Sequence, residues 1–244
     1  MSLAVVLFKQ TGMAFAFRWL HIIAGVAWIG LLYYFNFVQV PAFAEYKEAS
    51  ARLESIDKLA RRALWWFRWA ALATVVLGIL IMGATKDYFD NDAHVISILT
   101  GALMGVIMFV NVWGIIWRNQ KVVLANAVQV MGGGQPLPNL ATAQRAAAMA
   151  SRQNVLFSVA MIWFMTFTSH LSDAYDVSSG GKVATYWIIT LVIVALLELN
   201  ALGIIGGTGT GGLNWPYESV RNVLISAFGL WFVFWIMWEI LFKV

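Results

Sequence analysis

The sequence predicts an all-α protein, a polytopic membrane helical bundle with about six transmembrane helices. The first observation is composition: 61% of the 244 residues are hydrophobic and 11% are charged, whereas a soluble domain carries roughly a quarter charged residues. The second is distribution, because the apolar residues fall into blocks of about 20, the length that crosses a bilayer. The third is tryptophan, which gathers near block ends as in an interfacial aromatic belt.

The apolar blocks predict six membrane-spanning helices. We expect them over residues 14–40, 63–83, 94–117, 153–171, 183–206 and 220–241. The first should stop at Pro41, because proline lacks the N–H that a helix interior needs. Residues 1–172 hold the first four helices, and residues 173–244 add two helices to the same membrane domain. The first block is long enough to remain in the membrane, so we expect no cleavable signal peptide.

Three connections have a distinct character. Residues 45–62 alternate charge with an apolar stripe at Leu53, Ile56 and Leu59, which predicts either an amphipathic surface helix or an extension of the second helix. Residues 118–152 predict a second polar helix, broken by glycine at 132–134 and restarting after Pro138. The glycine-rich run 206–212 has no lysine at a phosphate-loop position and is interpreted as a flexible loop.

Basic residues predict the orientation of the chain. Ten basic residues fall in the connections between helices one and two, three and four, and five and six, and five fall on the opposite side of the membrane. The ten are Lys47, Arg52, Lys58, Arg61, Arg62, Arg118, Lys121, Arg145, Arg152 and Arg221. The ten-residue side should be cytoplasmic. We therefore expect a multi-pass protein of the bacterial inner (cytoplasmic) membrane with both termini periplasmic, whereas an odd helix count would put only the C-terminus on the other side. The net charge of +4 reports this topology and indicates no nucleic-acid partner.

The candidate chemistry lies with the histidines. His21, His94 and His170 fall on three different helices, all at the predicted periplasmic side. Neutral imidazole is a common ligand of haem iron and of metals. The chain has no cysteine, which excludes disulfides, thiolate metal sites, iron–sulfur clusters and covalently attached c-type haem. A b-type haem or a single copper ion held by the three histidines remains, although no spacing signature marks a copper site.

His21 is the strongest candidate ligand. Gly25, one turn on, would let a flat macrocycle approach the backbone, and Trp28, two turns on, would wall the pocket. Arg18, one turn before, would pair with a haem propionate, since arginine suits carboxylates. The alternative is an interfacial histidine that is hydrogen-bonded to a neighbouring helix, with Gly25 serving helix packing.

His170 is the natural second ligand. It lies near the predicted end of its helix, whereas His21 lies roughly 10 Å inside its own helix at 1.5 Å per residue. The pair therefore requires either a helix that continues toward Tyr175 or an offset between the two helices. His94 follows the acidic loop 87–92 and is more typical of a helix-end residue.

Polar residues within the predicted spans are further candidates, because ionisable groups are costly in a membrane. Glu198 is either a proton-relay group or a packing residue bonded to Asn36, Asn111 or Asn154. In the third helix, Gly101 with the glycine four residues later predicts close helix packing.

Several motifs resemble the N-terminal transmembrane domain of the bacterial membrane-bound urate oxidase (urate hydroxylase) family. They cover roughly residues 14–172 in order: RWLHIIAGVAWIG (18–30), WFRW (66–69), the glycine-rich stretch 101–113, NQK (119–121), SRQN (151–154) and SH (169–170). The resemblance implies a periplasmic-side redox site with His21 and His170. The family pattern has histidine near Leu99 and at Gln153, and often a C-terminal cytochrome c domain. This chain has neither histidine and cannot bind c-type haem covalently.

Three functions follow, in this order. The first is a b-type haem-binding membrane electron-transfer protein that exchanges electrons with a cytochrome c or another redox subunit. The second is a non-catalytic accessory subunit of a larger respiratory or photosynthetic membrane complex, or of an oligomer. The third is membrane-bound oxidation of urate or another purine.

Overall fold

The computed structural model describes residues 9–85 and 91–244. Within these residues the chain is helical, and its one β-type contact is an isolated bridge between Tyr175 and Lys243. Lys86, one of the five basic residues counted on the opposite side, and residues 87–90 of the acidic loop lie outside the described residues. The elements are α2 (Gln10–Tyr33), η1 (Tyr34–Gln39), α3 (Val40–Glu45), α4 (Ala49–Ser55), η2 (Ile56–Ala60), α5 (Arg61–Ala84), α6 (Asp92–Val110), η3 (Asn111–Ile116), α7 (Trp117–Met131), α8 (Leu140–His170), η4 (Ser172–Ala174), α9 (Gly180–Ala201), η5 (Gly212–Tyr217) and α10 (Val220–Phe242).

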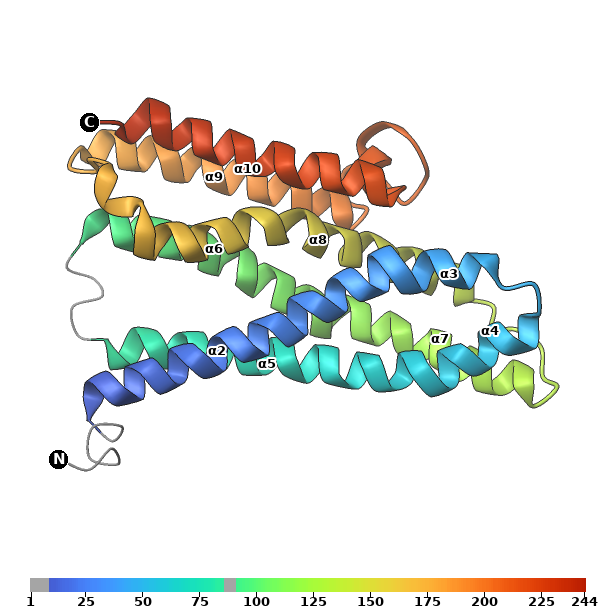
Figure 1. The fold of residues 1–244 in the computed structure, drawn as a ribbon. Helices are drawn as coiled ribbons and strands as arrows, with labels where there is room; N and C mark the ends of the chain where they lie inside the picture. The colour runs from blue at the N-terminus through green and yellow to red at the C-terminus, as the bar shows by residue number, and fades with distance from the viewer. Residues whose placement is uncertain (1–8, 86–90) are drawn as a thin grey trace.

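The long helices run back and forth along one axis (Figure 1). The starts of α2 and α6 and the end of α10 lie at one end of the bundle, together with the connection that precedes α9. We call this the histidine end. The other end carries the connections that the ten counted basic residues occupy, and we call it the arginine end. α2 packs along α5, while α6 and α10 pack on α8.

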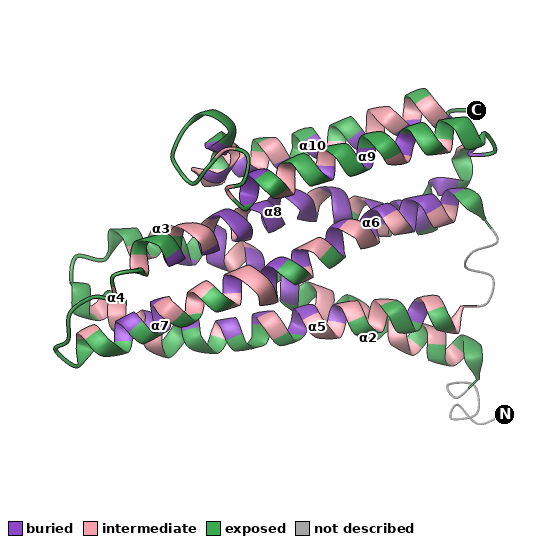
Figure 2. Ribbon diagram, turned by 180° about the vertical axis from the view of Figure 1, so that it is seen from behind, coloured by how far each residue is buried: buried purple, intermediate pink, exposed green. Residues whose placement is uncertain are grey.

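Five helical stretches of the described chain are long and apolar enough to cross a membrane: Gln10–Glu45, Ala49–Ala84, Asp92–Met131, Gly180–Ala201 and Val220–Phe242. The predicted fourth span lies within α8, which does not meet the same hydropathy. The lower hydropathy of α8 is explained by its enclosed position in the bundle, because α8 buries 15 residues and α2 only two. Figure 2 shows the burial concentrated on α8 and α6. A helix enclosed by other helices can carry polar residues that a lipid-facing helix cannot.

Pro41 does not end the first helix, contrary to the prediction. The chain remains helical from Gln10 to Glu45. The π-helical segment η1 immediately precedes α3, in which Pro41 takes a first-turn position. There the missing N–H costs little, because the preceding turn is already wound wider than an α-helix.

The polar connections extend the membrane helices. Of the two alternatives for residues 45–62, the structure has the extension, since α4, η2 and α5 run continuously from Ala49 to Ala84. The predicted polar helix after the third span is also continuous with it, as α7. It ends at Met131, before the glycines, and α8 begins at Leu140, after Pro138. The break expected from the glycines and prolines is therefore confirmed.

The glycine-rich connection is tied down by side chains. The Asn214 amide nitrogen lies 3.0–3.1 Å from the carbonyl oxygens of Gly206, Gly207 and Gly209. Arg145 on α8 donates to the same loop, including the Gly209 carbonyl at 2.7 Å. A Cβ on Gly206 would approach the Asn200 side-chain oxygen far too closely. The sequence predicts a flexible loop here, and the structure adds these hydrogen bonds to its backbone. Glycine permits them because it lets side chains approach the backbone closely.

Gly101 lets α6 approach α8, as the sequence predicts. A Cβ at Gly101 would lie 3.2 Å from Met165 Cε and 3.2 Å from Phe164 Cβ. Those distances are shorter than ordinary van der Waals contact, so any side chain must displace α8. Nearby, Ser97 and Thr168 hydroxyl oxygens are 2.9 Å apart across the same pair of helices.

We expect Gly101→Leu to lower the free energy of unfolding in detergent by about 1–3 kcal/mol, the usual cost of overpacking. Gly30→Leu is the matched control, because no heavy atom lies within 4 Å of a Cβ built there. Both changes raise helix propensity equally. Equal stability of the two variants in a denaturant or thermal unfolding series would contradict close α6–α8 packing at Gly101.

The segment after His170 is fastened to the end of α10. The Asp176 N–H donates to the Phe242 carbonyl at 2.8 Å, beside the Tyr175–Lys243 bridge. The Tyr175 hydroxyl donates to Glu239 Oε1 at 2.8 Å, so Glu239 ties the connection to its own helix. Burial, reinforced by the Glu239 carboxylate, raises the pKa of Tyr175 to about 12.

The raised pKa of Tyr175 makes stability depend on alkaline pH. The unfolded tyrosine titrates near 10, so the stabilisation is complete below pH 10 and is lost as the pH rises toward 12. We expect the stability difference between wild type and Tyr175→Phe to shrink over that interval. An absorbance titration of phenolate should lose amplitude near pH 12 in the variant. Loss near pH 10 instead would contradict the Glu239 contact.

Candidate functional site

His21 is held by α5. Its Nδ1 lies 2.8 Å from the carbonyl oxygen of Thr74, and because a carbonyl only accepts, Nδ1 must donate. The neutral ring then carries its lone pair on Nε2. A Cβ added to Gly78 on α5 would lie 3.3 Å from His21 Cε1, so the imidazole occupies the space that this glycine leaves. Orientation by a backbone carbonyl is typical of metal-ligating histidines.

The second nitrogen of His21 is open. Among the described residues Nε2 has no hydrogen-bond partner, and it is not one of the fully enclosed unpaired atoms. His21 is half-buried on a helix long and apolar enough to cross the membrane. An unpaired imidazole nitrogen facing hydrocarbon is unfavourable. The geometry therefore fits a ligand bound at Nε2.

The neighbours of His21 on α2 divide between packing and exposure. Gly25 faces α5, where a Cβ would make only an ordinary contact with Thr74 Cγ2 at 3.9 Å. Arg18 is exposed one turn toward the histidine end. Trp28 is 2% exposed, and its indole N–H is buried without a partner among the described residues. Trp28 therefore packs in the core of the bundle, where the sequence predicted a pocket wall.

His21 and His170 lie equally far along their helices from a shared contact. The hydroxyl oxygens of Tyr33 on α2 and Ser158 on α8 are 2.8 Å apart, which sets the register of these antiparallel helices. His21 precedes Tyr33 by twelve residues and His170 follows Ser158 by twelve, so both lie about 18 Å from that contact at 1.5 Å per residue. Of the two alternatives for the pairing, this register favours an offset between the helices. The helix does not continue to Tyr175.

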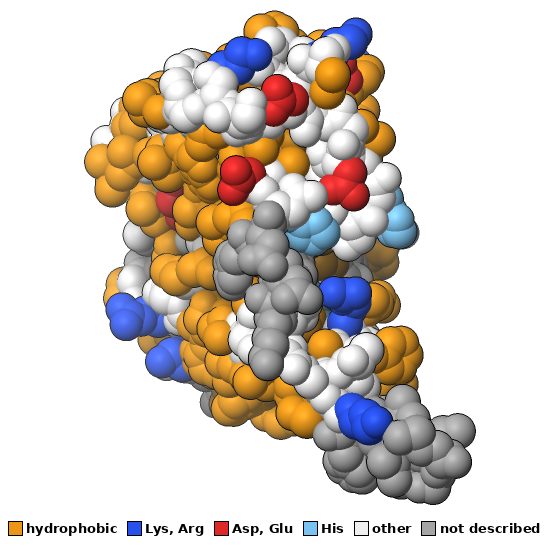
Figure 3. Space-filling model, turned by 90° about the vertical axis from the view of Figure 1, so that its left-hand side faces the viewer, with side chains coloured by type: hydrophobic (Ala, Val, Ile, Leu, Met, Phe, Trp, Pro, Cys, Tyr) orange, Lys and Arg blue, Asp and Glu red, His pale blue; other side chains and the backbone are white. Residues whose placement is uncertain are grey.

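Depth alone does not bring the two histidines together. α2 and α5 diverge from α6 and α8 toward the histidine end in both ribbon views. His170 is the exposed last residue of α8, on the α6–α8 side, whereas His21 lies on the α2–α5 side. Figure 3 shows this end of the molecule, with histidine, acidic and basic side chains on one face.

His94 occupies the first turn of α6, as predicted for a helix-end residue. The side chain of Asn91 caps this helix by accepting from the His94 backbone N–H at 3.1 Å, and it also donates to Asp173 at 2.7 Å. The charges of Asp173 and Arg18 both act on His94. In residues 9–85 and 91–244 there is no group of three or more histidine, aspartate or glutamate side chains arranged to hold a metal ion. The three-histidine copper site therefore finds no support.

A polar layer lies deeper in the bundle. Asn111 donates to Asn154 Oδ1 at 3.0 Å and to Glu198 Oε2 at 3.2 Å. Asn154 in turn donates to the Met108 carbonyl at 2.9 Å. Glu198 is therefore bonded to Asn111, one of the three partners named for the packing alternative. Asn111 opens the π-helical segment η3, and such segments are frequent at functional sites.

Gln153 has a partner that the sequence did not reveal. Tyr217, in η5, donates from its hydroxyl to Gln153 Oε1 at 2.7 Å and lies 3.1 Å from the Leu197 carbonyl. Arg152 donates to the Tyr217 carbonyl. Tyr217 lies in a connection next to Pro216, with no periodic pattern to mark it as buried. Of the two positions where the resembling family has histidine, Gln153 is buried and Leu99 is half-buried.

Comparison with protein-family models, with curated proteins and with solved structures finds no match for this chain. The likeness to membrane-bound urate oxidases thus stays a prediction from the motifs. The functional argument rests on the residues themselves.

We expect Asn111→Val to lower the free energy of unfolding by about 1–3 kcal/mol, because it strands buried polar atoms of Asn154 and Glu198. Asn119→Val is the control and should cost less than about 1 kcal/mol, since within residues 9–85 and 91–244 the Asn119 side chain bonds only the Ile115 carbonyl of its own helix turn. Detergent unfolding of both variants measures the difference. A smaller loss of stability for Asn111→Val than for the control would show that the polar layer does not stabilise the bundle.

Proposed function

We propose that this chain is a b-type haem-binding membrane electron-transfer protein with His21 as an axial ligand. One observation carries the proposal: the Thr74 carbonyl holds Nδ1 of His21, which presents a neutral, unpartnered Nε2. Haem iron takes such nitrogens. The glycine at position 78, which makes room for the ring, fits the same reading.

The surrounding residues have roles that match a bound haem. When bound, the haem supplies reversible one-electron chemistry. Thr74 keeps the imidazole in the tautomer that leaves Nε2 free. Arg18, exposed one turn toward the histidine end, suits a propionate. His170, at a matching distance along α8 from the Tyr33–Ser158 contact, is the candidate second ligand.

The electron partner should meet the histidine end. Both described chain ends lie there, and the basic-residue count predicts that this end is periplasmic, in a bacterial inner membrane. A cytochrome c or another redox subunit on that side would exchange electrons with the haem. α2 buries only Trp28 and Leu32 in the bundle. Its remaining surface is compatible with contact to another subunit of a larger membrane complex.

Purified protein should give a b-type reduced-minus-oxidised absorption band. His21→Ala should abolish the band because it removes the axial nitrogen, whereas His94→Ala should keep it. Gly78→Leu should weaken it, because the new side chain occupies the space of the His21 ring, while Gly83→Leu, with open space at its Cβ, should not. Absorbance at matched protein concentration measures each.

Two results would overturn the haem proposal. Wild-type protein expressed with ample haem but without the band would favour the accessory-subunit function, which co-purification of stable partner subunits would then support. An undiminished band in folded His21→Ala would assign the ligand elsewhere. If His170→Ala keeps the haem but shifts the position of its absorption band, His170 is the second axial ligand beside His21.

A further inference from the structure

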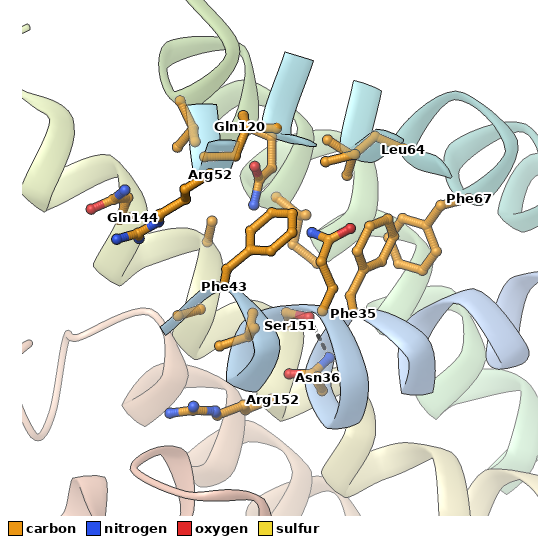
Figure 4. Close-up of a pocket in the computed structure, with 18 residues that line it drawn as sticks. Phe35, Asn36, Phe43, Arg52, Leu64, Phe67, Gln120, Gln144, Ser151 and Arg152 are labelled. Carbon is orange, nitrogen blue, oxygen red and sulfur yellow. Dashed lines mark hydrogen bonds between the residues drawn. The ribbon is translucent and has the colours of Figure 1, made fainter. Parts of the chain in front are cut away.

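A cavity at the arginine end is unconnected with the histidines. It has a volume of about 300 Å³, at the lower limit for small-molecule sites. η1 and α3, α4 and η2, α5, η3 and α7, and α8 all contribute to its wall. Figure 4 shows Phe43 in its middle, with Gln120 pointing toward the ring and Arg52 beside Gln144 at one edge.

The charge of this cavity is one-sided. Its lining includes Arg52 and Arg152 and no aspartate or glutamate. Among residues 9–85 and 91–244 neither arginine has an acidic group within ion-pair distance. Glu218 acts on Arg152 from farther away, and Arg152 also donates to the Tyr217 carbonyl. Guanidinium groups that lack carboxylate partners are suited to binding an anion.

Gln39 supplies an independent sign of a missing partner. Its side chain lines the cavity, is 9% exposed, and has a buried Oε1 with no hydrogen-bond partner in the described chain. A stranded buried acceptor costs about 1–3 kcal/mol. A ligand N–H or O–H would satisfy it. Gln120 and Gln144 add further amides to the wall.

The rest of the wall is apolar and aromatic. Phe35 and Phe67 meet edge to face with ring centroids 5.5 Å apart, and Phe43 lies across from them in Figure 4. Such a wall favours a ligand with a flat apolar body. The cavity volume admits a small molecule and excludes a whole phospholipid.

We propose that this cavity binds a small organic anion whose flat apolar body also carries a hydroxyl or amine hydrogen-bond donor. Arg52 and Arg152 bind the anionic group, the phenylalanines contact the body, and Gln39 Oε1 accepts from the donor. The proposal is independent of haem and holds whether or not His21 binds one.

4-Hydroxybenzoate carries each feature and serves as the probe. Titration calorimetry on the full chain in phosphatidylcholine nanodiscs should show saturable binding. Benzoate, which lacks the donor, should bind about ten-fold more weakly, and neutral 4-hydroxybenzamide should not bind measurably. Arg52→Gln should weaken 4-hydroxybenzoate binding about ten-fold or more, as expected for a lost charged hydrogen bond.

Two variants make the test specific. Arg62→Gln removes an equally exposed arginine that does not line the cavity and should leave binding unchanged. Gln39→Leu should abolish the preference for 4-hydroxybenzoate over benzoate while benzoate still binds. Three results would overturn the proposal: no binding to folded wild type, equal weakening in Arg52→Gln and Arg62→Gln, or loss of binding when the nanodiscs contain phosphatidylglycerol, which would assign the site to lipid phosphate.

Discussion

In a membrane bundle, a polar side chain must find its partner within the protein, and α8 is where this constraint acts most strongly. Asn154 both accepts from α6–η3 and donates to it. Ser158 meets Tyr33 of α2, Ser151 meets Asn36 of η1, and Thr168 meets Ser97 of α6. These short hydrogen bonds fix the register of each neighbour against α8. The two candidate haem ligands therefore lie equally far along their helices from the Tyr33–Ser158 contact.

The three π-helical segments change where side chains point. An extra residue in one turn rotates the helix beyond it, and this allows Asn36 and Asn111, both within such segments, to face α8. It also accommodates Pro41 in a continuous helix. The first three long stretches can therefore extend past the bilayer thickness as single helices. Their extensions form most of the wall of the arginine-end cavity.

The two ends of the bundle offer different chemistry. The histidine end presents a neutral nitrogen held by a backbone carbonyl, which suits a metal centre. The arginine end presents guanidinium groups and amides around aromatic rings, which suits an organic anion. Asn36, which bonds Ser151 on α8, lies fifteen residues after His21 along the first helix, about 22 Å. The proposed sites thus act separately.

The sequence by itself determined the fold class, five of the six predicted membrane-spanning helices and the glycine and proline break before α8, because hydropathy, helix length and these two residues act locally along the chain. It also singled out His21 and the possible bonding of Glu198 to Asn111. Only the tertiary structure decided that α8 is enclosed, that Pro41 is tolerated, and that Gly78 and the Thr74 carbonyl hold His21. It alone assembled Gln39, Arg52 and Arg152 around one cavity. These features depend on helix register and on side-chain partners far apart in sequence, and no local pattern specifies either.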